Sequence, residues 1–332
     1  MRPSLKLLIL SSLLTVTLYG CERKPDNSLE QQTEVATASP EKSEPVLQAE
    51  LEPVALTLPK CDDQQCPEIK IQRLKSNYPE LDQTIDRFIV SYVANLVQGF
   101  DLDGSTPKSS EKTEDEAQNT PIGSMAEQQT KAADGRVTQT DGQLKNAELQ
   151  GDIDKFIQLA DEVKSLGSNA KLNIYIKPDV LNPQGPVATV VMNANNYIGG
   201  AHGSSTQQYI NFELATQSIL NLDQIIQTGQ RKAFNDLAYQ AFQDWIVQTQ
   251  PDMDVKTYRV GCEFTLSQNF FLSSNGLILQ YGEYEIGPYA IGLPRLVIPY
   301  EQLKDILKPQ YLPVVTTPTQ DETTPQTTKT SK

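Results

Sequence analysis

The chain has 332 residues, a length that accommodates one large domain or two of ordinary size. Its 42 acidic and 28 basic residues give a formal net charge of −14, and only 38% of its residues are hydrophobic. Phosphate contacts require clustered basic side chains, so this charge argues against a nucleic-acid partner and favours a cationic one.

The amino terminus has the features of a bacterial secretory signal. Arg2 and Lys6 precede an apolar run over residues 7–18, which is too short to span a bilayer comfortably. The segment ends in Leu18-Tyr19-Gly20-Cys21, which resembles a lipobox, the motif in which the cysteine is acylated and becomes the first residue. We therefore expect a signal peptide over residues 1–20 and lipid attachment at Cys21. Simple secretion and an uncleaved anchor are the alternatives.

Lipid attachment at Cys21 predicts a place in the cell envelope. Removal of residues 1–20 takes away Arg2 and Lys6, so the net charge of the mature chain becomes −14 − 2 = −16. Several buried acyl chains hold a protein stably at a membrane. Glu22 follows the cysteine, whereas retention at the inner membrane usually favours Asp there. We expect the outer membrane, with the protein facing the periplasm.

The next segment is polar and leads to a pair of cysteines. Residues 21–59 lack a sustained apolar period, which predicts a disordered tether. In an oxidising compartment, the spacing of Cys61 and Cys66 predicts a local disulfide. A metal site is disfavoured, because this spacing is long for a cysteine pair and no second pair follows. Cys262 then remains as a buried, inert thiol, and we expect no cofactor.

We expect the folded domain to span residues 60–311, with a smaller N-terminal part over residues 60–168. Apolar residues at helical spacing predict core helices over residues 82–100 and 153–163. Residues 101–145 contain few large apolar side chains and cannot bury enough surface to offset the entropy of ordering. This composition predicts a disordered insertion.

The C-terminal part, residues 172–307, begins with strands. Residues 172–176 alternate, and residues 187–192 and 207–214 have the composition of two hairpin strands. The turn between them contains Tyr197, Gly199, Gly200 and His202, which is the single histidine of the chain. The glycines can supply positive φ and the histidine can fix the turn by bonding to the backbone, or the turn can contact a ligand directly.

The remaining sequence predicts a helix over residues 230–248, a second hairpin over residues 269–281, a strand over residues 296–298 and a helix that starts at Pro299. The loop over residues 283–292 contains Tyr284 and Tyr289, in a composition that suits recognition, although burial of both rings is an equal alternative. Residues 312–332 predict a disordered tail. Helices and hairpins without regular βαβ alternation predict an α+β domain, in which an antiparallel or mixed sheet packs against helices.

Short motifs follow one another in the C-terminal part. They are Tyr197-x-Gly199-Gly200-Ala201-His202-Gly203, Tyr209-x-Asn211-Phe212, Leu220-x-Leu222-Asp223, Phe271-x-x-x-x-x-Leu277, Tyr284-Glu285-Ile286-x-Pro288-Tyr289-x-x-Gly292 and Ile298-Pro299-Tyr300-x-x-Leu303. In this order they resemble the C-terminal extracytoplasmic domain of the anti-sigma factor RsiV. The same module is similar to one that precedes the catalytic domain of the peptidoglycan deacetylase PdaC.

The resemblance implies an α+β fold and, as in RsiV, direct binding of lysozyme. Neither sigma-factor regulation nor deacetylation is expected, because the sequence shows no cytoplasmic sigma-binding segment, no transmembrane helix and no deacetylase domain. We expect a non-enzymatic envelope lipoprotein that binds a lysozyme-like protein or a peptidoglycan fragment.

Two alternatives remain beside this expectation. One is a peptidoglycan hydrolase centred on His202, with Ser204 or Ser205 as its nucleophile. Neither serine lies in a nucleophile-elbow context and no acidic partner can be identified, so we expect no enzymatic activity. The other alternative is a purely structural envelope protein.

Overall fold

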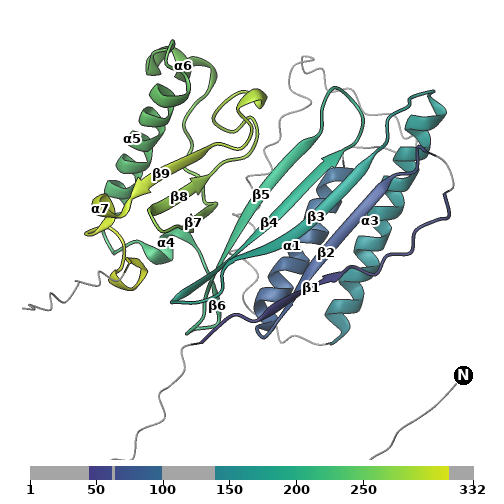
Figure 1. Cartoon of the computed structure of the whole chain (residues 1–332), viewed down its shortest axis with the longest axis horizontal. Coiled ribbons are helices and arrows are strands. Elements are labelled where there is room, and N and C mark those ends of the chain that lie inside the picture. The colour runs from purple at the N-terminus through teal and green to yellow at the C-terminus, as the bar shows by residue number, and fades with distance from the viewer. Residues whose placement is uncertain (1–44, 62–63, 99–138, 314–332) are drawn as a thin grey trace, which may run out of the picture. The chain divides into compact units, whose positions relative to one another are not determined.

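The computed structural model describes residues 45–61, 64–98 and 139–313, which form two sheets and the helices that pack on them (Figure 1). The α+β class predicted from the sequence is confirmed. The predicted signal peptide, Cys21, the first part of the tether, most of the insertion and nearly all of the tail lie outside the described residues.

The larger sheet has six strands in the order β1-β2-β3-β4-β5-β6. Its neighbouring strands are antiparallel, except for β2 and β3, which are parallel and are therefore joined by a helical crossover. The elements of this part are β1 (Ala49–Pro53), β2 (Glu68–Ser76), α1 (Pro79–Val97), α3 (Gln139–Ser165), β3 (Asn173–Asn182), β4 (Val187–Tyr197), β5 (Ser204–Glu213) and β6 (Ser218–Leu220).

Helices α1 and α3 lie against one face of the larger sheet and complete its core (Figure 1). Helix α1 has Pro79 in its first turn, where a missing N–H costs nothing because the first amides of a helix have no helical acceptor. Its buried residues recur at intervals of three and four, which confirms the predicted apolar face. This face packs with Phe156 of α3 and Phe212 of β5, both fully buried.

The smaller sheet has three antiparallel strands in the order β7-β8-β9. Helix α5 buries Phe234, Ala238, Phe242 and Ile246, which are four residues apart, in a second apolar cluster with this sheet. The elements of this part are α4 (Leu222–Ile225), α5 (Arg231–Thr249), α6 (Val255–Gly261), β7 (Phe270–Leu272), β8 (Gly276–Gln280), β9 (Arg295–Pro299), α7 (Tyr300–Leu303) and the 3-10 turns Tyr289–Ile291 and Pro309–Tyr311.

Strand β4 contributes to both apolar clusters. Its first six residues are all buried, which explains why this stretch is apolar apart from Thr189 and does not alternate. Ala188 and Val190 belong to the cluster under α1 and α3, whereas Val187 belongs to the cluster under α5. The hairpin of β4 and β5 therefore receives support from the packing of both parts.

The structure corrects three predicted boundaries. Strand β1 lies inside residues 21–59, so the tether prediction is wrong there; the strand is mostly exposed and is held by its pairing with β2. Helix α3 starts at Gln139, within the predicted insertion of residues 101–145. The predicted division between residues 60–168 and 172–307 cuts through one sheet, because β2 pairs with β3.

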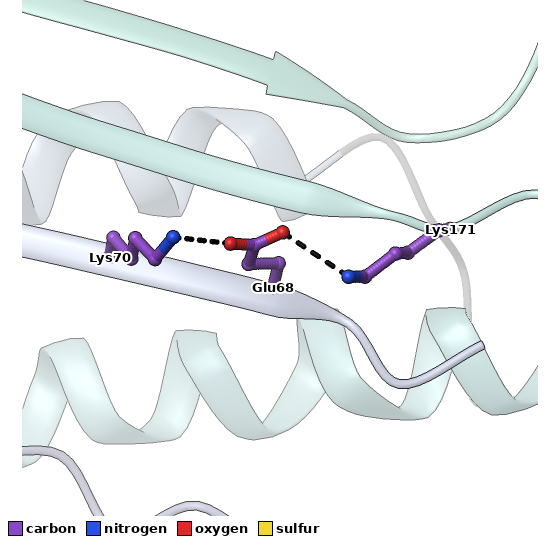
Figure 2. A network of polar contacts seen from close by, with 3 residues as sticks. All are labelled: Glu68, Lys70 and Lys171. Carbon is purple, nitrogen blue, oxygen red and sulfur yellow. Dashed lines mark hydrogen bonds and ion pairs between the residues drawn. The ribbon is translucent and has the colours of Figure 1, made fainter. Parts of the chain in front are cut away.

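A charged network lies where β2 begins beside β3. Glu68 accepts a hydrogen bond from Lys70 and another from Lys171, whose Nζ is 3.2 Å from Oε2 (Figure 2). Lys70 also lies 5.4 Å from the ring centroid of Tyr175, its cross-strand neighbour. Hydrogen bonds from Lys70, Tyr175 and Lys171 lower the pKa of the Glu68 carboxyl from about 4.5 to about 2.

Candidate functional site

The turn between β4 and β5 is shaped by its glycines. Gly199 and Gly200 both have φ of 94°, a left-handed value that confirms their predicted role. The Tyr197 hydroxyl donates to the Gly200 carbonyl oxygen at 2.9 Å. A Cβ at Gly203 would lie 2.7 Å from the carbonyl oxygen of Asn196, so this position also excludes a larger residue. The conformation of the turn is therefore fixed by its glycine backbone and by the hydrogen bond from Tyr197.

The loop between β8 and β9 is held in place by two hydrogen bonds. The buried Tyr258 side chain donates from its hydroxyl to the carbonyl oxygen of Ile286 at 3.0 Å. The Gly282 N–H donates to a carboxylate oxygen of Glu285 at 2.7 Å. Burial raises the pKa of Glu285. Tyr284 stands between these anchors with φ of 65°, a left-handed value that a residue other than glycine rarely adopts.

The two loops meet through three aromatic rings, which we name the aromatic patch: His202, Tyr284 and Tyr289. The His202 ring stacks on Tyr289 with 3.7 Å between centroids and 20° between planes. The Tyr284 hydroxyl lies 3.2 Å from His202 Nε2, and the centroids of the two tyrosine rings are 5.6 Å apart. Tyr284 is 47% exposed, His202 is exposed and Tyr289 is half-buried. The alternative of two buried tyrosines is therefore wrong.

The backbone at Gly203 joins the patch to the hairpin. Its carbonyl oxygen accepts the Tyr289 hydroxyl at 3.0 Å and lies 2.9 Å from His202 Nδ1. The histidine therefore fixes the turn through the backbone, as one of the two sequence-based alternatives predicted. Because His202 also presents an exposed ring, the second alternative of direct ligand contact stays open.

Glu283 attaches the second loop to the start of β5. Its carboxylate accepts the Ser204 hydroxyl at 2.9 Å and the Ser205 N–H at 3.0 Å. Beneath the same end of the hairpin, the buried Asn196 amide donates to the Tyr92 hydroxyl of α1 at 2.7 Å. Burial raises the pKa of Tyr92 to about 12. A buried hydrogen bond thus joins the tip of the hairpin to α1.

Further along β5, the Asn269 side chain forms backbone hydrogen bonds that a neighbouring strand would otherwise form. The Asn269 amide oxygen accepts the Tyr209 N–H at 2.8 Å, and its nitrogen donates to the Gln207 carbonyl oxygen at 2.7 Å. Arg295 of β9 donates to the side chains of Gln207 and Tyr209 at 2.8 and 2.9 Å. Unpaired backbone groups at a strand edge invite further pairing, so this bridging satisfies them within the chain.

The serines beside His202 do not form a nucleophile–base pair with it in the described structure. Both ring nitrogens of His202 have other neighbours, namely the Gly203 carbonyl oxygen and the Tyr284 hydroxyl. Ser204 donates to Glu283, and Ser205 contacts Glu283 through its backbone N–H. A Ser–His mechanism requires a hydrogen bond between the hydroxyl and the imidazole.

Three cysteines lie within the described residues. Cys61 and Cys66 form a disulfide with an S–S distance of 2.12 Å, which confirms the predicted pairing. Cys262 carries a free thiol and is half-buried against the cluster under α5, less deeply than predicted. Over residues 45–61, 64–98 and 139–313, no group of three or more His, Cys, Asp or Glu side chains is placed to hold a metal ion.

The helices and the surface groove of the described residues do not extend the candidate site. None of its helices is both long enough and apolar enough to cross a bilayer. A groove of about 290 Å³ lies between α5 and β9, lined by Trp245, Asp244 and Val297 among others, and it contains no residue of the aromatic patch.

Sequence patterns named the rings of the patch but missed the residues that position them. Glu283, Asn269 and Arg295 act through partners about sixty to ninety positions away in the chain. Such long-range hydrogen bonds leave no local periodicity. The only available signal was the position of Glu283 and Asn269 next to predicted turns and strands.

Comparisons with known proteins give a family for part of the chain and a fold for most of it. Residues 223–301 match a family described as "Protein of unknown function (DUF3298)". A crystal structure of a DUF3298 family protein from Pseudomonas aeruginosa is similar to this chain, with a TM-score of 0.51 and 21% identity, covering 82% of this chain and 98% of that one. At this identity the likeness shows the fold alone.

A second DUF3298 family structure, from Bacteroides fragilis, has a TM-score of 0.49 and 17% identity, and covers 80% of this chain and 95% of that one. Among curated proteins, none matches the chain significantly. These findings name neither RsiV nor PdaC, so that resemblance stays a prediction.

Proposed function

We propose that this chain is a non-enzymatic lipoprotein of the bacterial outer membrane, facing the periplasm, and that it binds a cationic, lysozyme-like protein through the aromatic patch. The observation that carries the proposal is the construction of the patch. Tyr284 is 47% exposed, yet its hydroxyl lies 3.2 Å from His202, which itself stacks on Tyr289. Exposed rings that are held in place form a surface ready for contact.

A patch fixed in advance favours binding. Aromatic side chains offer large contact area, and rings that are already ordered lose little conformational entropy when a partner arrives. The φ of 65° at Tyr284 costs on the order of 1 kcal/mol and persists only where surrounding contacts enforce it. Backbone strain of this kind concentrates at functional sites, which supports the same assignment.

Charge favours a cationic protein as the partner. The predicted mature chain carries a net charge of −16, and complementary charge accelerates encounter at low ionic strength. The resemblance to RsiV, which binds lysozyme, points to the same class of partner. A peptidoglycan fragment would use the same rings by stacking, and its binding would depend less on salt.

The hydrogen bonds around His202 support a role without bond-making. A general base must reach the proton that it removes. In this chain, His202 Nδ1 and Nε2 lie beside the Gly203 carbonyl and the Tyr284 hydroxyl, and Ser204 donates to Glu283.

The proposal is tested by calorimetric binding of lysozyme to the full-length protein in detergent, across a series of salt concentrations. We expect binding at low salt that weakens as salt increases, and a loss of about tenfold or more in Tyr284→Ala. Val297→Ala is the matched control, because Val297 is also 47% exposed but lies on β9 facing the separate groove. It should bind as the wild type does.

Three other results would contradict the proposal. Binding of a muropeptide without binding of lysozyme would indicate a glycan receptor. Turnover of muropeptides that disappears in His202→Ala would indicate a hydrolase. Absence of both binding and turnover at low salt would favour a structural role.

A further inference from the structure

We infer that Glu283 and Tyr284 together form a receptor for the guanidinium group of an arginine on the protein partner. This inference rests on the proposed function and names the chemistry that the aromatic patch recognises. It is carried by a carboxylate with unused acceptor capacity beside an exposed aromatic ring.

Glu283 is a carboxylate without a cationic partner among the described residues. The ion pairs found in this part of the chain involve other acidic residues, such as Glu68, Glu80 and Asp223. Glu283 accepts only two neutral donors, the Ser204 hydroxyl and the Ser205 N–H. A carboxylate has about four acceptor positions, so about two remain for an incoming donor.

Glu285 adds to the negative potential of the loop. It lies two residues along from Glu283 and also has no ion pair in the described structure, where it accepts the Gly282 N–H. Tyr284, the residue between them, offers an exposed ring. A cation is attracted to the face of an aromatic ring, and this attraction increases beside a carboxylate that is partly shielded from water.

The pairing of a carboxylate with an aromatic ring suits a guanidinium better than an ammonium ion. A planar guanidinium can stack on a ring while its N–H groups donate to a carboxylate, whereas an ammonium ion is compact and strongly hydrated. A related arrangement with neutral acceptors in place of a carboxylate occurs at Arg295 of the same chain. Arg295 lies 5.9 Å from the centroid of Phe271 while it donates hydrogen bonds to Gln207 and Tyr209.

The test measures binding of a fluorescent Gly-Arg-Gly-Arg-Gly peptide to the full-length protein by anisotropy at low salt. Peptides with lysine or citrulline in place of arginine are compared. We expect the arginine peptide to bind at least threefold tighter than the lysine peptide, and the uncharged citrulline peptide to show no binding. Glu283→Gln and Tyr284→Leu should each weaken the arginine peptide about tenfold.

The control distinguishes binding at Glu283 and Tyr284 from nonspecific attraction to the negative charge of the whole protein. Glu301→Gln removes one charge from an exposed residue of α7 that has no ion pair in the described structure. It should change the affinity less than twofold. Circular dichroism of each variant checks that the fold is retained; Gln at position 283 preserves an oxygen that can accept the Ser205 N–H.

Equal losses in Glu283→Gln and Glu301→Gln, or equal binding of arginine and lysine peptides, would overturn the inference. Lysozyme binding that is unchanged in Glu283→Gln would also overturn it and leave the proposed function standing. Specific arginine binding in a protein that does not bind lysozyme would support the receptor and remove the lysozyme-like partner.

Discussion

The rings of His202 and Tyr289 stack at 3.7 Å between centroids, although they belong to two separate loops. One loop joins the strands of the β4–β5 hairpin, and the other joins β8 to β9. This contact couples the larger sheet to the smaller one at the candidate site. The surface that would meet a partner therefore exists only when both sheets are folded.

His202→Ala should weaken both the loop contact and the binding of lysozyme. The substitution removes the stack on Tyr289 and the hydrogen bonds of both ring nitrogens. A stacked pair and an exposed hydrogen bond are each worth about 1 kcal/mol, so we expect a loss of about 1–2 kcal/mol in the free energy of unfolding. Denaturant unfolding measures this loss and calorimetry the affinity. Wild-type affinity in this variant would remove His202 from the binding surface.

Phe212→Ala should destabilise the larger sheet strongly. Phe212 is fully buried, and its ring centroid lies 5.0 Å from that of Tyr78. Truncation of a buried phenylalanine costs about 3–5 kcal/mol, because it removes apolar contacts and leaves a cavity. Urea unfolding of the variant provides the measurement. A loss below about 1 kcal/mol would mean that the core rearranges to fill the space.

Asn269→Ala should lower the free energy of unfolding, because it removes the hydrogen bonds at the edge of β5. It leaves the Tyr209 N–H and the Gln207 carbonyl without their side-chain partner. An unsatisfied buried group costs about 1–3 kcal/mol, and partial access of water to this edge places the expected loss near the lower end. Asn195→Ala, an exposed position on β4, is the control and should change stability by less than about 0.5 kcal/mol. Equal effects of the two substitutions on the unfolding free energy would refute the bridging role of Asn269.

Acid should remove a contribution that Glu68 makes to stability. Its hydrogen bonds lower the folded-state pKa from about 4.5 to about 2, so the carboxylate favours the folded state above the unfolded pKa. That contribution declines as the pH falls from about 4.5 to about 2. Glu68→Gln has no carboxylate there, and its unfolding free energy should depend less on pH across this window. Identical acid limbs for wild type and variant would show that the network is not formed in solution.

Cys21 should carry the lipid. Cys21→Ser should abolish incorporation of labelled palmitate and release the protein from the membrane fraction, because a single apolar run of residues 7–18 is a poor membrane anchor. Labelling followed by density-gradient separation of inner and outer membranes measures both effects. Palmitate labelling that persists in the serine variant would contradict the lipobox prediction.

The sequence predicted those helices and hairpins whose residue pattern lies within a single short segment. The helical spacing in α1 and α5 and the hairpins of β4 with β5 and β7 with β8 were all found near their predicted positions. The 230–248 prediction differs from Arg231–Thr249 by a single residue at each end. Each of the two helices buries one apolar face, whereas β8 and most of β4 are buried on both faces, and in both cases the signal lies in the segment's own sequence.

The sequence did not reveal elements that depend on distant partners. Strand β1 is mostly exposed and has little apolar signal, because backbone pairing with β2 is what orders it. The same reason explains the wrong division at residues 168–172, since the parallel pairing of β2 with β3 joins segments on both sides of it. In the candidate site, the sequence singled out the three aromatic rings that the structure brings together, whereas Glu283 and Asn269 depend on contacts that only the folded chain creates.

The parallel pairing of β2 with β3 also imposes an order on biosynthesis. Ile71 pairs with Ile176, which the ribosome adds 105 positions later (176 − 71 = 105). Closing so long a stretch of chain precedes any gain from the pairing, and this slows the assembly of a sheet. Until β3 has been added, β2 has one edge without a strand partner, and its backbone groups can pair with another chain during this interval.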